Sequence, residues 1–306
     1  MKHLIFKSLV FIAILLLTIV FLLECSSFIV KRRGFLNYQT ESNLLFFKTQ
    51  TDYDVLFIGI SHARNFSRHK NHIQVEKILN KSIINIGQGS AACGVNEQLF
   101  YLDYFYHLKN RTQKVIYMLS PPLFFSESLP KASNTFNNET FEFSFFYRYL
   151  FFNSENKKER VQSYLRSKLT KQWLETYPFS LESKTEKLDS LDTKEVQKGQ
   201  DFAYGKSPSL ERFRKSTIKI EETINLAITN NSDVILIIPP ALFGKWPEHD
   251  KVVDFAKKMT KNKRVEFYDY SESILKPEYY YDHHHLNTKG IIFFTDNYLK
   301  PIISGK

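Results

Sequence analysis

Short runs of apolar residues alternate along this chain with longer stretches that have the spacing of helices. The apolar runs are DVLFIGI, SIINIG, KVIYMLS, DVILIIPP and VEFYDY, at residues 54–60, 82–87, 114–120, 233–240 and 265–270. Unbroken hydrophobicity of this length is typical of strands that are buried on both faces of a parallel sheet. We therefore predict five parallel strands at these positions.

The stretches between the runs predict helices. Three are expected at residues 96–108, 209–229 and 248–260, and a fourth after Asn287. Pro247 stands at the start of the third, where proline is tolerated. Strands that alternate with helices form a parallel sheet covered on both faces, so the predicted fold class is α/β.

A further apolar run near the N-terminus is longer than these five and has the length of a membrane-spanning helix. Residues 8–23 hold no charge, and with the residues just before them the run reaches the lower limit of about 17–20 residues for a span. A cleaved signal peptide is the alternative. No small-x-small cleavage site follows the run, and Glu24 directly before Cys25 does not fit a lipoprotein-type site. We therefore expect an uncleaved N-terminal transmembrane helix.

The alternation divides the chain into an anchor, a linker and a folded body. We assign residues 1–30 to the anchor and its flank, 31–52 to the linker and 53–303 to the body. The alternation stops at residues 126–206, where the aromatic run FEFSFFYRYLFF (141–152) is followed by charged and polar residues. A segment this long between two strands predicts a cap-like insertion. The aromatic run is either the small core of that insertion or a surface that touches the membrane or the substrate.

Composition adds a bias in charge but no cofactor or metal signature. The 306 residues are 43% hydrophobic, which is enough for one substantial core with an added subdomain. The net charge of +10 favours an anionic partner, such as a phospholipid surface, a wall polymer or a nucleic acid. The two cysteines, Cys25 and Cys93, supply neither a disulfide framework nor a metal-ligand set.

Two strand ends carry residues with the chemistry of a nucleophile site. Reactive groups of open α/β sheets lie at the carboxyl ends of the strands, and Ser61 follows the first strand in FIGISHARN. Gly87 and Gly89 follow the second strand in NIGQGSAACG. Glycines there let a ligand oxygen approach backbone N–H groups, as an oxyanion hole requires. The alternatives are a serine that caps the next helix and a glycine turn without a ligand.

The segment DHHHLNTKG, from Asp282 to Gly290, offers a base for such a serine. Asp282 and His285 are three residues apart, so on one turn the carboxylate can hold one imidazole nitrogen while the other takes a proton from a serine. The alternatives are a solvated loop and a metal site built from the three adjacent histidines. Adjacent residues of an extended chain face opposite ways, and the sequence has no second cluster of metal-ligand spacing. We therefore predict a catalytic Asp282–His285 pair and no bound metal or cofactor.

Together these motifs resemble the SGNH/GDSL hydrolase superfamily. The resemblance rests on Gly-x-Ser after the first strand, a glycine after the second, and a late Asp-x-x-His followed by LNTKG. It covers residues 53–303 without the insertion and implies a flavodoxin-like three-layer sandwich. The site residues that it implies are Ser61 as the nucleophile, Asp282 and His285 as the terminal dyad, and Gly87 or Gly89 in the oxyanion hole. We expect the backbone N–H of Ser61 to donate to the oxyanion together with that of the glycine.

The chain departs from the superfamily at two of its motifs. Ile60 replaces the acid of Gly-Asp-Ser, and the third motif, Gly-x-Asn-Asp, is absent because the third strand runs into MLSPPLFF. The oxyanion asparagine is therefore unassigned, and Asn96 and Ser120 are the candidates for its role.

These departures and the anchor resemble a membrane-anchored bacterial branch of the superfamily. The branch includes the D-alanine-transfer protein of teichoic acid alanylation and alginate O-acetyltransferase-type proteins. It implies a body outside the cytoplasmic membrane, often beside a multi-spanning membrane-bound O-acyltransferase. The flanking charges mildly favour the opposite orientation, since Lys2 and Lys7 precede the anchor and Lys31, Arg32 and Arg33 follow it. We follow the branch and expect an extracytoplasmic body.

We therefore expect a membrane-anchored serine esterase or O-acyltransferase that acts on a cell-envelope glycan or polymer. A second hypothesis is a catalytically inactive relative that binds envelope polymer or docks onto a membrane-bound O-acyltransferase, and the absent third motif supports it. Nucleic-acid binding is not expected, because the chain has an anchor and no basic stripe interleaved with base-stacking aromatic residues.

Overall fold

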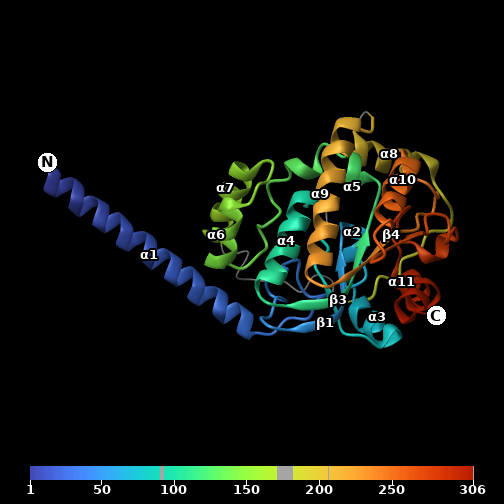
Figure 1. The fold of residues 1–306 in the computed structure, drawn as a ribbon, viewed down its shortest axis with the longest axis horizontal. Helices are drawn as coiled ribbons and strands as arrows, with labels where there is room; N and C mark the ends of the chain where they lie inside the picture. The colour runs from blue at the N-terminus through green and yellow to red at the C-terminus, as the bar shows by residue number, and fades with distance from the viewer. Residues whose placement is uncertain (90–92, 171–181, 206, 306) are drawn as a thin grey trace.

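Five parallel strands form one sheet at the centre of the body (Figure 1). The computed structural model describes residues 1–89, 93–170, 182–205 and 207–305. The strands are β1 (Asp52–Ile58), β2 (Ile83–Asn85), β3 (Arg111–Met118), β4 (Asp233–Ile238) and β5 (Val265–Asp269). They lie in the order β2-β1-β3-β4-β5, which is the flavodoxin-like order. The predicted α/β class and five-stranded parallel sheet are confirmed.

Helices join the strands, and four of them are those that the sequence predicts. These four are α4 (Val95–His107), α9 (Leu210–Thr229), α10 (His249–Met259) and α11 (Thr288–Phe294). Side chains cap two of them, since Ser209 Oγ accepts the Arg212 N–H at 3.2 Å and Asn287 Oδ1 accepts the Gly290 N–H at 2.9 Å. The other helices of the described residues are α1 (Lys2–Arg32), α2 (Ser61–Arg64), α3 (Asn71–Leu79), α5 (Pro122–Phe125), α6 (Phe143–Phe151), α7 (Lys157–Lys168), α8 (Thr193–Tyr204) and α12 (Lys300–Ser304). They are joined by the 3₁₀ helices η1 (Leu129–Lys131) and η3 (Pro277–Tyr279) and by the π-helix η4 (Thr295–Leu299).

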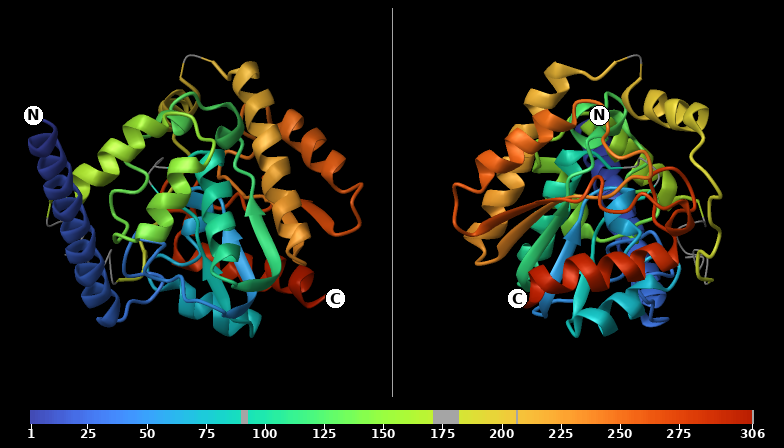
Figure 2. Two further views of the ribbon diagram at one scale, coloured as in Figure 1. Left: turned by 60° about the vertical axis from the view of Figure 1, so that its left-hand side comes forward. Right: turned by 90° about the vertical axis from the view of Figure 1, so that its right-hand side faces the viewer.

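Helices cover both faces of the sheet (Figure 2). The strand side chains alternate between these faces and form one core on each. Leu56 and Val115 lie on the face that α4, α9 and α10 cover. Phe57 and Ile116 lie on the face that α3 and α11 cover. The strand register keeps this alternation, because Leu56 pairs with Val115 and Phe57 pairs with Ile116. The body is therefore a three-layer sandwich of helices, sheet and helices.

The aromatic run of the insertion forms α6, which has one buried face and one exposed face. Phe145 and Tyr149 are buried and join the core on the α4 side of the sheet. The run therefore extends the main core and does not form a small separate one. Phe143, Tyr147 and Phe151 lie on the exposed face of the same helix.

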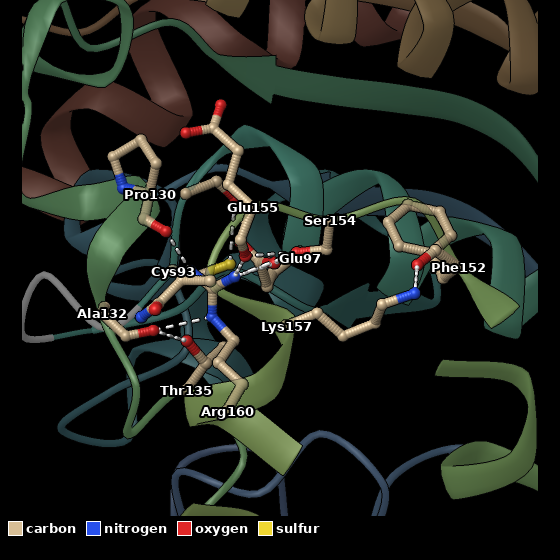
Figure 3. A network of polar contacts seen from close by, with 12 residues as sticks. Cys93, Glu97, Pro130, Ala132, Thr135, Phe152, Ser154, Glu155, Lys157 and Arg160 are labelled. Carbon is tan, nitrogen blue, oxygen red and sulfur yellow. Dashed lines mark hydrogen bonds and ion pairs between the residues drawn. The ribbon is translucent and has the colours of Figure 1, made fainter. Parts of the chain in front are cut away.

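A buried ion pair holds α7 of the insertion against α4 (Figure 3). The side chains of Arg160 and Glu97 are fully buried, and Arg160 Nη1 lies 2.6 Å from Glu97 Oε1. The same guanidinium donates to the carbonyl oxygens of Pro130 and Ala132 at 2.6 and 2.7 Å. Burial raises the pKa of Glu97 to about 7, although the guanidinium beside it favours the charged form. Removing one partner of a buried pair typically costs about 3–5 kcal/mol because the other charge is left buried and unpaired, so the packing of α7 on α4 depends on the presence of both partners.

The segment between α1 and β1, which the sequence assigns to a linker, packs onto the body. The buried carboxylate of Glu139 accepts hydrogen bonds from Ser42 Oγ at 2.7 Å and from the N–H groups of Asn43 and Leu44 at 2.9 and 2.7 Å. Leu44 is itself fully buried. The segment therefore fixes the end of α1 beside the body.

Helix α1 extends from the body with most of its apolar side chains exposed (Figure 1). Its 31 residues are long and apolar enough to cross a membrane, a test that a signal sequence near the N-terminus also passes. Its C-terminal part contacts α6, since Glu24 Oε1 accepts the Phe143 N–H at 2.5 Å and Lys31 forms an ion pair with Glu142. The polar end of α1 is thus attached to the insertion.

Candidate active site

Ser61 lies directly beyond the carboxyl end of β1. The strand ends at Ile58, Gly59 turns the chain with a φ of +145°, and Ser61 is the first residue of α2. A Cβ at Gly59 would lie 2.9 Å from the backbone oxygen of Met118, so this turn requires glycine. The turn determines where the Ser61 hydroxyl leaves the sheet.

The Asp282 carboxylate folds the histidine segment into a tight turn. Its Oδ1 accepts the backbone N–H groups of His284 and His285 at 2.9 and 2.7 Å, and its Oδ2 lies 2.7 Å from His285 Nδ1. Aspartate favours such turns because its short side chain reaches the backbone two and three residues further on. The turn therefore holds the His285 ring by one of its two nitrogens.

The other nitrogen of His285 faces Ser61, although the two residues are 224 positions apart in the sequence. His285 Nε2 lies 2.7 Å from Ser61 Oγ. Because a carboxylate only accepts hydrogen bonds, His285 Nδ1 carries the proton and Nε2 has the lone pair. The Ser61 hydroxyl therefore donates to Nε2, and the imidazole can take this proton when the oxygen attacks a carbon atom. Ser61, His285 and Asp282 thus form one hydrogen-bonded chain.

The electrostatics of the site keep Asp282 ionised. Burial raises the pKa of this carboxyl, but the adjacent His285 and the hydrogen bonds of the turn outweigh burial and hold the pKa well below its usual range. A carboxylate in this position stabilises the positive charge that develops on the imidazole during proton transfer.

His62, directly after Ser61, packs against His285 and was not assigned a role by the sequence motifs. The centroids of the two rings are 4.8 Å apart at an interplanar angle of 29°. His62 Nε2 lies 3.1 Å from the carbonyl oxygen of His284, and Nδ1 lies 2.7 Å from Ser120 Oγ. A carbonyl oxygen only accepts, so Nε2 carries the proton and Ser120 donates to Nδ1. Burial, with the nearby His285 and His284, lowers the pKa of His62 well below its usual value, so this ring is neutral.

His284 completes a group of three imidazoles. Ligating nitrogens of His62, His284 and His285 lie within 4.8 Å of one another, which is close enough to share a metal ion. The Nε2 atoms of His62 and His285 are already bonded to a carbonyl oxygen and to Ser61, so metal binding would have to break these hydrogen bonds. Burial, together with the neighbouring His285, lowers the pKa of His284 to about 3. The hydrogen bonds favour proton transfer at His285 over metal binding.

Ser61, Asp282 and His285 line a cavity of about 440 Å³, a size that suits a small ligand. Helix α8 of the insertion forms one wall through Phe202 and Ala203. The other walls carry both apolar and polar side chains, and Ser126, Ser128, His62 and His284 are among the polar ones. The apolar residues are Ile60, Pro122, Leu129 and Trp246, and Arg68 and Tyr281 add a guanidinium and a phenol.

A larger hollow of about 900 Å³ lies at the other end of the sheet. Its lining includes Asp52 and Arg111, the first residues of β1 and β3, and Asn230. It contains none of the three hydrogen-bonded residues of the smaller cavity. The chemistry is therefore concentrated in the smaller cavity at the carboxyl ends of the strands.

The glycines expected in an oxyanion hole serve the packing of the strand end. The Gly87 N–H donates to Asn85 Oδ1 at 2.9 Å, and a Cβ at Gly87 would lie 2.7 Å from Arg64 N. Gly89 lies against the guanidinium of Arg68, which would overlap a Cβ there. Neither glycine is among the described residues that line the cavity.

Asn96, a candidate for the oxyanion hole, is not among the described residues that line the cavity. Asn96 is buried in the first turn of α4 and lines a different hollow with Arg212 and Ser216 of α9. The first turn of α4 therefore lies beside α9 at this position. Ser120 does reach the site, but its hydroxyl binds His62.

Comparisons with known proteins give distant likenesses only. No family model matches the chain, and no curated protein matches it. A candidate acylhydrolase from Bacteroides fragilis is 14% identical with a TM-score of 0.42, and the match covers 82% of this chain and 86% of the other. A GDSL-like lipase from Bacteroides thetaiotaomicron is 14% identical with a TM-score of 0.38, and the match covers 84% of this chain and 89% of the other. Likenesses at these TM-scores carry no argument about activity.

Proposed function

We propose that the chain is a membrane-anchored serine esterase or O-acyltransferase that acts on a cell-envelope glycan or polymer. The observation that carries this proposal is the pair of 2.7 Å contacts from Ser61 Oγ to His285 Nε2 and from His285 Nδ1 to Asp282 Oδ2. A serine bound to an imidazole that a carboxylate orients is an arrangement that activates a hydroxyl for acyl transfer. The motifs that resemble SGNH/GDSL hydrolases support the same chemistry.

In this mechanism Ser61 Oγ attacks the carbonyl carbon of an ester and gives its proton to His285 Nε2. The bond to the alcohol oxygen then breaks, and His285 gives the proton to that oxygen, which leaves an acyl group on Ser61. In the second half, an incoming hydroxyl attacks the acyl carbon, loses its proton to His285 and releases Ser61. Water gives hydrolysis, whereas a glycan hydroxyl gives O-acyl transfer. Asp282 stays ionised and stabilises the imidazolium in both halves.

The tetrahedral intermediates also need donors for the developing oxyanion. Ser61 supplies its own N–H, because the first N–H groups of a helix have no partner within that helix. Arg68 lines the same cavity, and its guanidinium is held there by an ion pair with Glu41. We assign these two groups to oxyanion stabilisation, to which one donor typically contributes about 3 kcal/mol.

The membrane and envelope parts of the proposal have separate support. The length and composition of α1 suit a membrane span, and the net charge of +10 suits an anionic polymer. Helix α8 covers one side of the cavity, which would help a bound glycan hydroxyl to compete with water. The resemblance to the membrane-anchored branch supports two further parts of the proposal, an extracytoplasmic body and a membrane-bound O-acyltransferase as the partner.

Replacement of the proposed nucleophile tests the mechanism. The full chain in nanodiscs would be treated with a fluorophosphonate probe and assayed with p-nitrophenyl acetate. We expect the parent to be labelled and active, and Ser61→Ala to lose labelling and on the order of 10³-fold or more in kcat. Ser128→Ala is the matched control, since this serine lines the same cavity but bonds Ser126, and it should keep both properties. Equal labelling and hydrolysis in the parent and Ser61→Ala would refute the serine mechanism.

A catalytically inactive binding protein is the second candidate function. The Gly87 N–H is engaged by Asn85, and Asn96 lies in another hollow, so two expected oxyanion donors are missing among the described residues of the cavity. Such a protein would bind envelope polymer or dock onto a membrane-bound O-acyltransferase without reacting. An unlabelled Ser61 together with equal binding of an anionic glycan by the parent and Ser61→Ala would favour this candidate.

A further inference from the structure

The exposed face of α6 carries a row of apolar side chains beside the proposed membrane anchor. Phe143, Tyr147 and Phe151 are 49%, 53% and 74% exposed, and Leu150 is 37% exposed. The three rings are four residues apart and therefore lie on one side of the helix, with successive centroids 6.0 and 5.0 Å apart. We call these four residues the α6 stripe.

The stripe cannot turn inward, because the other side of α6 is held by the body. Phe145 and Tyr149 are buried in the main core. Arg148 pairs with Asp103 of α4 at 2.6 Å. Surface helices normally present polar residues outward, and contiguous exposed apolar patches mark interaction sites. The α6 stripe therefore needs a partner outside the body.

Helix α1 indicates where a bilayer would lie relative to this stripe. At 1.5 Å per residue, about 20 residues cross a hydrocarbon layer of about 30 Å. Residues 4–23 meet this need with Lys7 as the one charged residue, and Glu24 is the next charge along the chain. Glu24 Oε1 accepts the Phe143 N–H at 2.5 Å. The first residue of α6 is therefore attached to α1 where the apolar segment ends.

Helix α7 also has exposed apolar side chains, and it lies on the side of the body that faces α1. Figure 1 shows α6 and α7 on the side of the body that faces α1. The two helices pack through the stacked rings of Phe146 and Tyr164, whose centroids are 5.7 Å apart. Leu165 and Leu169 are 41% and 83% exposed, and Arg166 between them is exposed as well. Apolar side chains next to a basic one suit a layer of anionic headgroups.

We propose that the α6 stripe inserts into the interfacial layer of the bilayer that α1 crosses, so that the body lies flat against the membrane. The partner of the stripe is a phospholipid surface, because the apolar segment of α1 ends beside the first residue of α6 and the surface of the bilayer would lie at that level. Aromatic rings are stable in this layer, where one end of the ring is apolar and the other is wet. The inference rests on the proposed membrane anchor and not on the serine chemistry.

Quenching of tryptophan by brominated lipids tests the proposal in the full chain. Phe151→Trp would be reconstituted in vesicles of phosphatidylcholine and phosphatidylglycerol with bromine on the upper acyl chain. The parent, which contains Trp173 and Trp246, gives the background to subtract. Ile218→Trp is the matched control, because this residue is 58% exposed on α9. We expect the added emission of Phe151→Trp to lose most of its intensity and that of Ile218→Trp to keep it.

Each other outcome overturns a separate part of the proposal. Unquenched emission from both variants in a vesicle-bound chain would refute the membrane face and leave the anchor standing. A chain that alkaline carbonate removes from the vesicles would refute the anchor and the membrane face together. Fluorophosphonate labelling of the same samples reports on Ser61 and on folding separately. Tyr147→Trp, one turn earlier on the stripe, repeats the measurement should Phe151→Trp fail to fold.

Discussion

The Nε2 atom of His62 lies 3.1 Å from the carbonyl oxygen of His284, the residue directly before His285. This contact joins the residue after the candidate nucleophile to the residue before the candidate base. Because the His62 ring also stacks on His285 at 4.8 Å, the start of α2 and the histidine turn form one unit. The 2.7 Å contact between Ser61 and His285 therefore depends on a residue that does not touch the hydroxyl.

His62→Ala should slow acylation of Ser61 while the chain stays folded. The change removes the donor to the His284 carbonyl, and loss of a buried hydrogen-bond partner typically costs about 1–3 kcal/mol. If the loss misaligns Ser61 and His285 and raises the activation barrier by this amount, kcat falls by about 10–100-fold. His62→Gln keeps an N–H donor and should recover part of the rate. Steady-state kinetics with p-nitrophenyl acetate would measure this, and parental kcat in both variants would show that His62 only fills space.

Asp282→Asn should lower activity and remove a pH-dependent part of the stability. The amide no longer fixes the His285 tautomer, a defect that reduces kcat by on the order of 10²–10⁴-fold. The folded-state pKa of Asp282 lies below its usual value, so its carboxylate stabilises the fold above about pH 4 and this contribution is lost as the pH falls through the folded-state pKa. Urea unfolding of the parent and the variant should therefore differ at neutral pH and converge in acid. A difference that persists unchanged in acid would contradict the assignment.

Gly59→Ala should destabilise the chain and displace Ser61. The residue has a φ of +145°, and the new Cβ would lie 2.9 Å from the Met118 oxygen. Strain of this kind costs about 1–3 kcal/mol. Gly199→Ala in α8 is the control, because its Cβ would meet nothing within 4 Å and alanine favours a helix by about 0.5–1 kcal/mol. Urea unfolding should move the two variants in opposite directions, and parental stability of Gly59→Ala would refute the need for glycine.

The local pattern of apolar and polar residues was sufficient to predict the sheet and the longer helices around it. The unbroken run at residues 233–240 becomes β4 because all but its first residue are buried between two helical layers. Ser209 and Asn287 mark the starts of α9 and α11 because their side chains accept first-turn N–H groups. Helix α3 escapes such prediction, since it buries only Asn71, Val75 and Leu79 among polar neighbours.

Some residues of the candidate site could also be predicted from the local sequence, and others could not. Ser61, Asp282 and His285 could be singled out because strand ends share one edge of a parallel sheet and Asp-x-x-His closes a turn. The role of His62 has no local signal, because its partners Ser120 and His284 are 58 and 222 residues away. The surroundings of Asn96 also have no local signal, since they depend on which side of α4 faces α9.

Arg160→Met should be more damaging than the loss of both members of its ion pair. The single change leaves Glu97 buried without its cation, which costs about 3–5 kcal/mol. The double variant Glu97→Gln/Arg160→Met leaves no buried charge there and should recover part of this loss. Urea unfolding of the parent, the two single variants and the double variant gives the coupling energy. Strict additivity would mean that the pair does not hold α7 to α4.

Ala203→Trp should change which esters the cavity accepts. Ala203 lines the cavity of about 440 Å³ from α8, next to Phe202, and a larger side chain there takes up space that an acyl chain would fill. In apolar pockets one methylene is worth about 1–3 kcal/mol, so kcat/KM for p-nitrophenyl octanoate should fall by at least about tenfold relative to the acetate. Lys198→Trp is the matched control, since this residue is on the same helix with a side chain that is 71% exposed. Equal losses for both esters would indicate that α8 has moved, and an unchanged ratio would place the acyl group outside this wall.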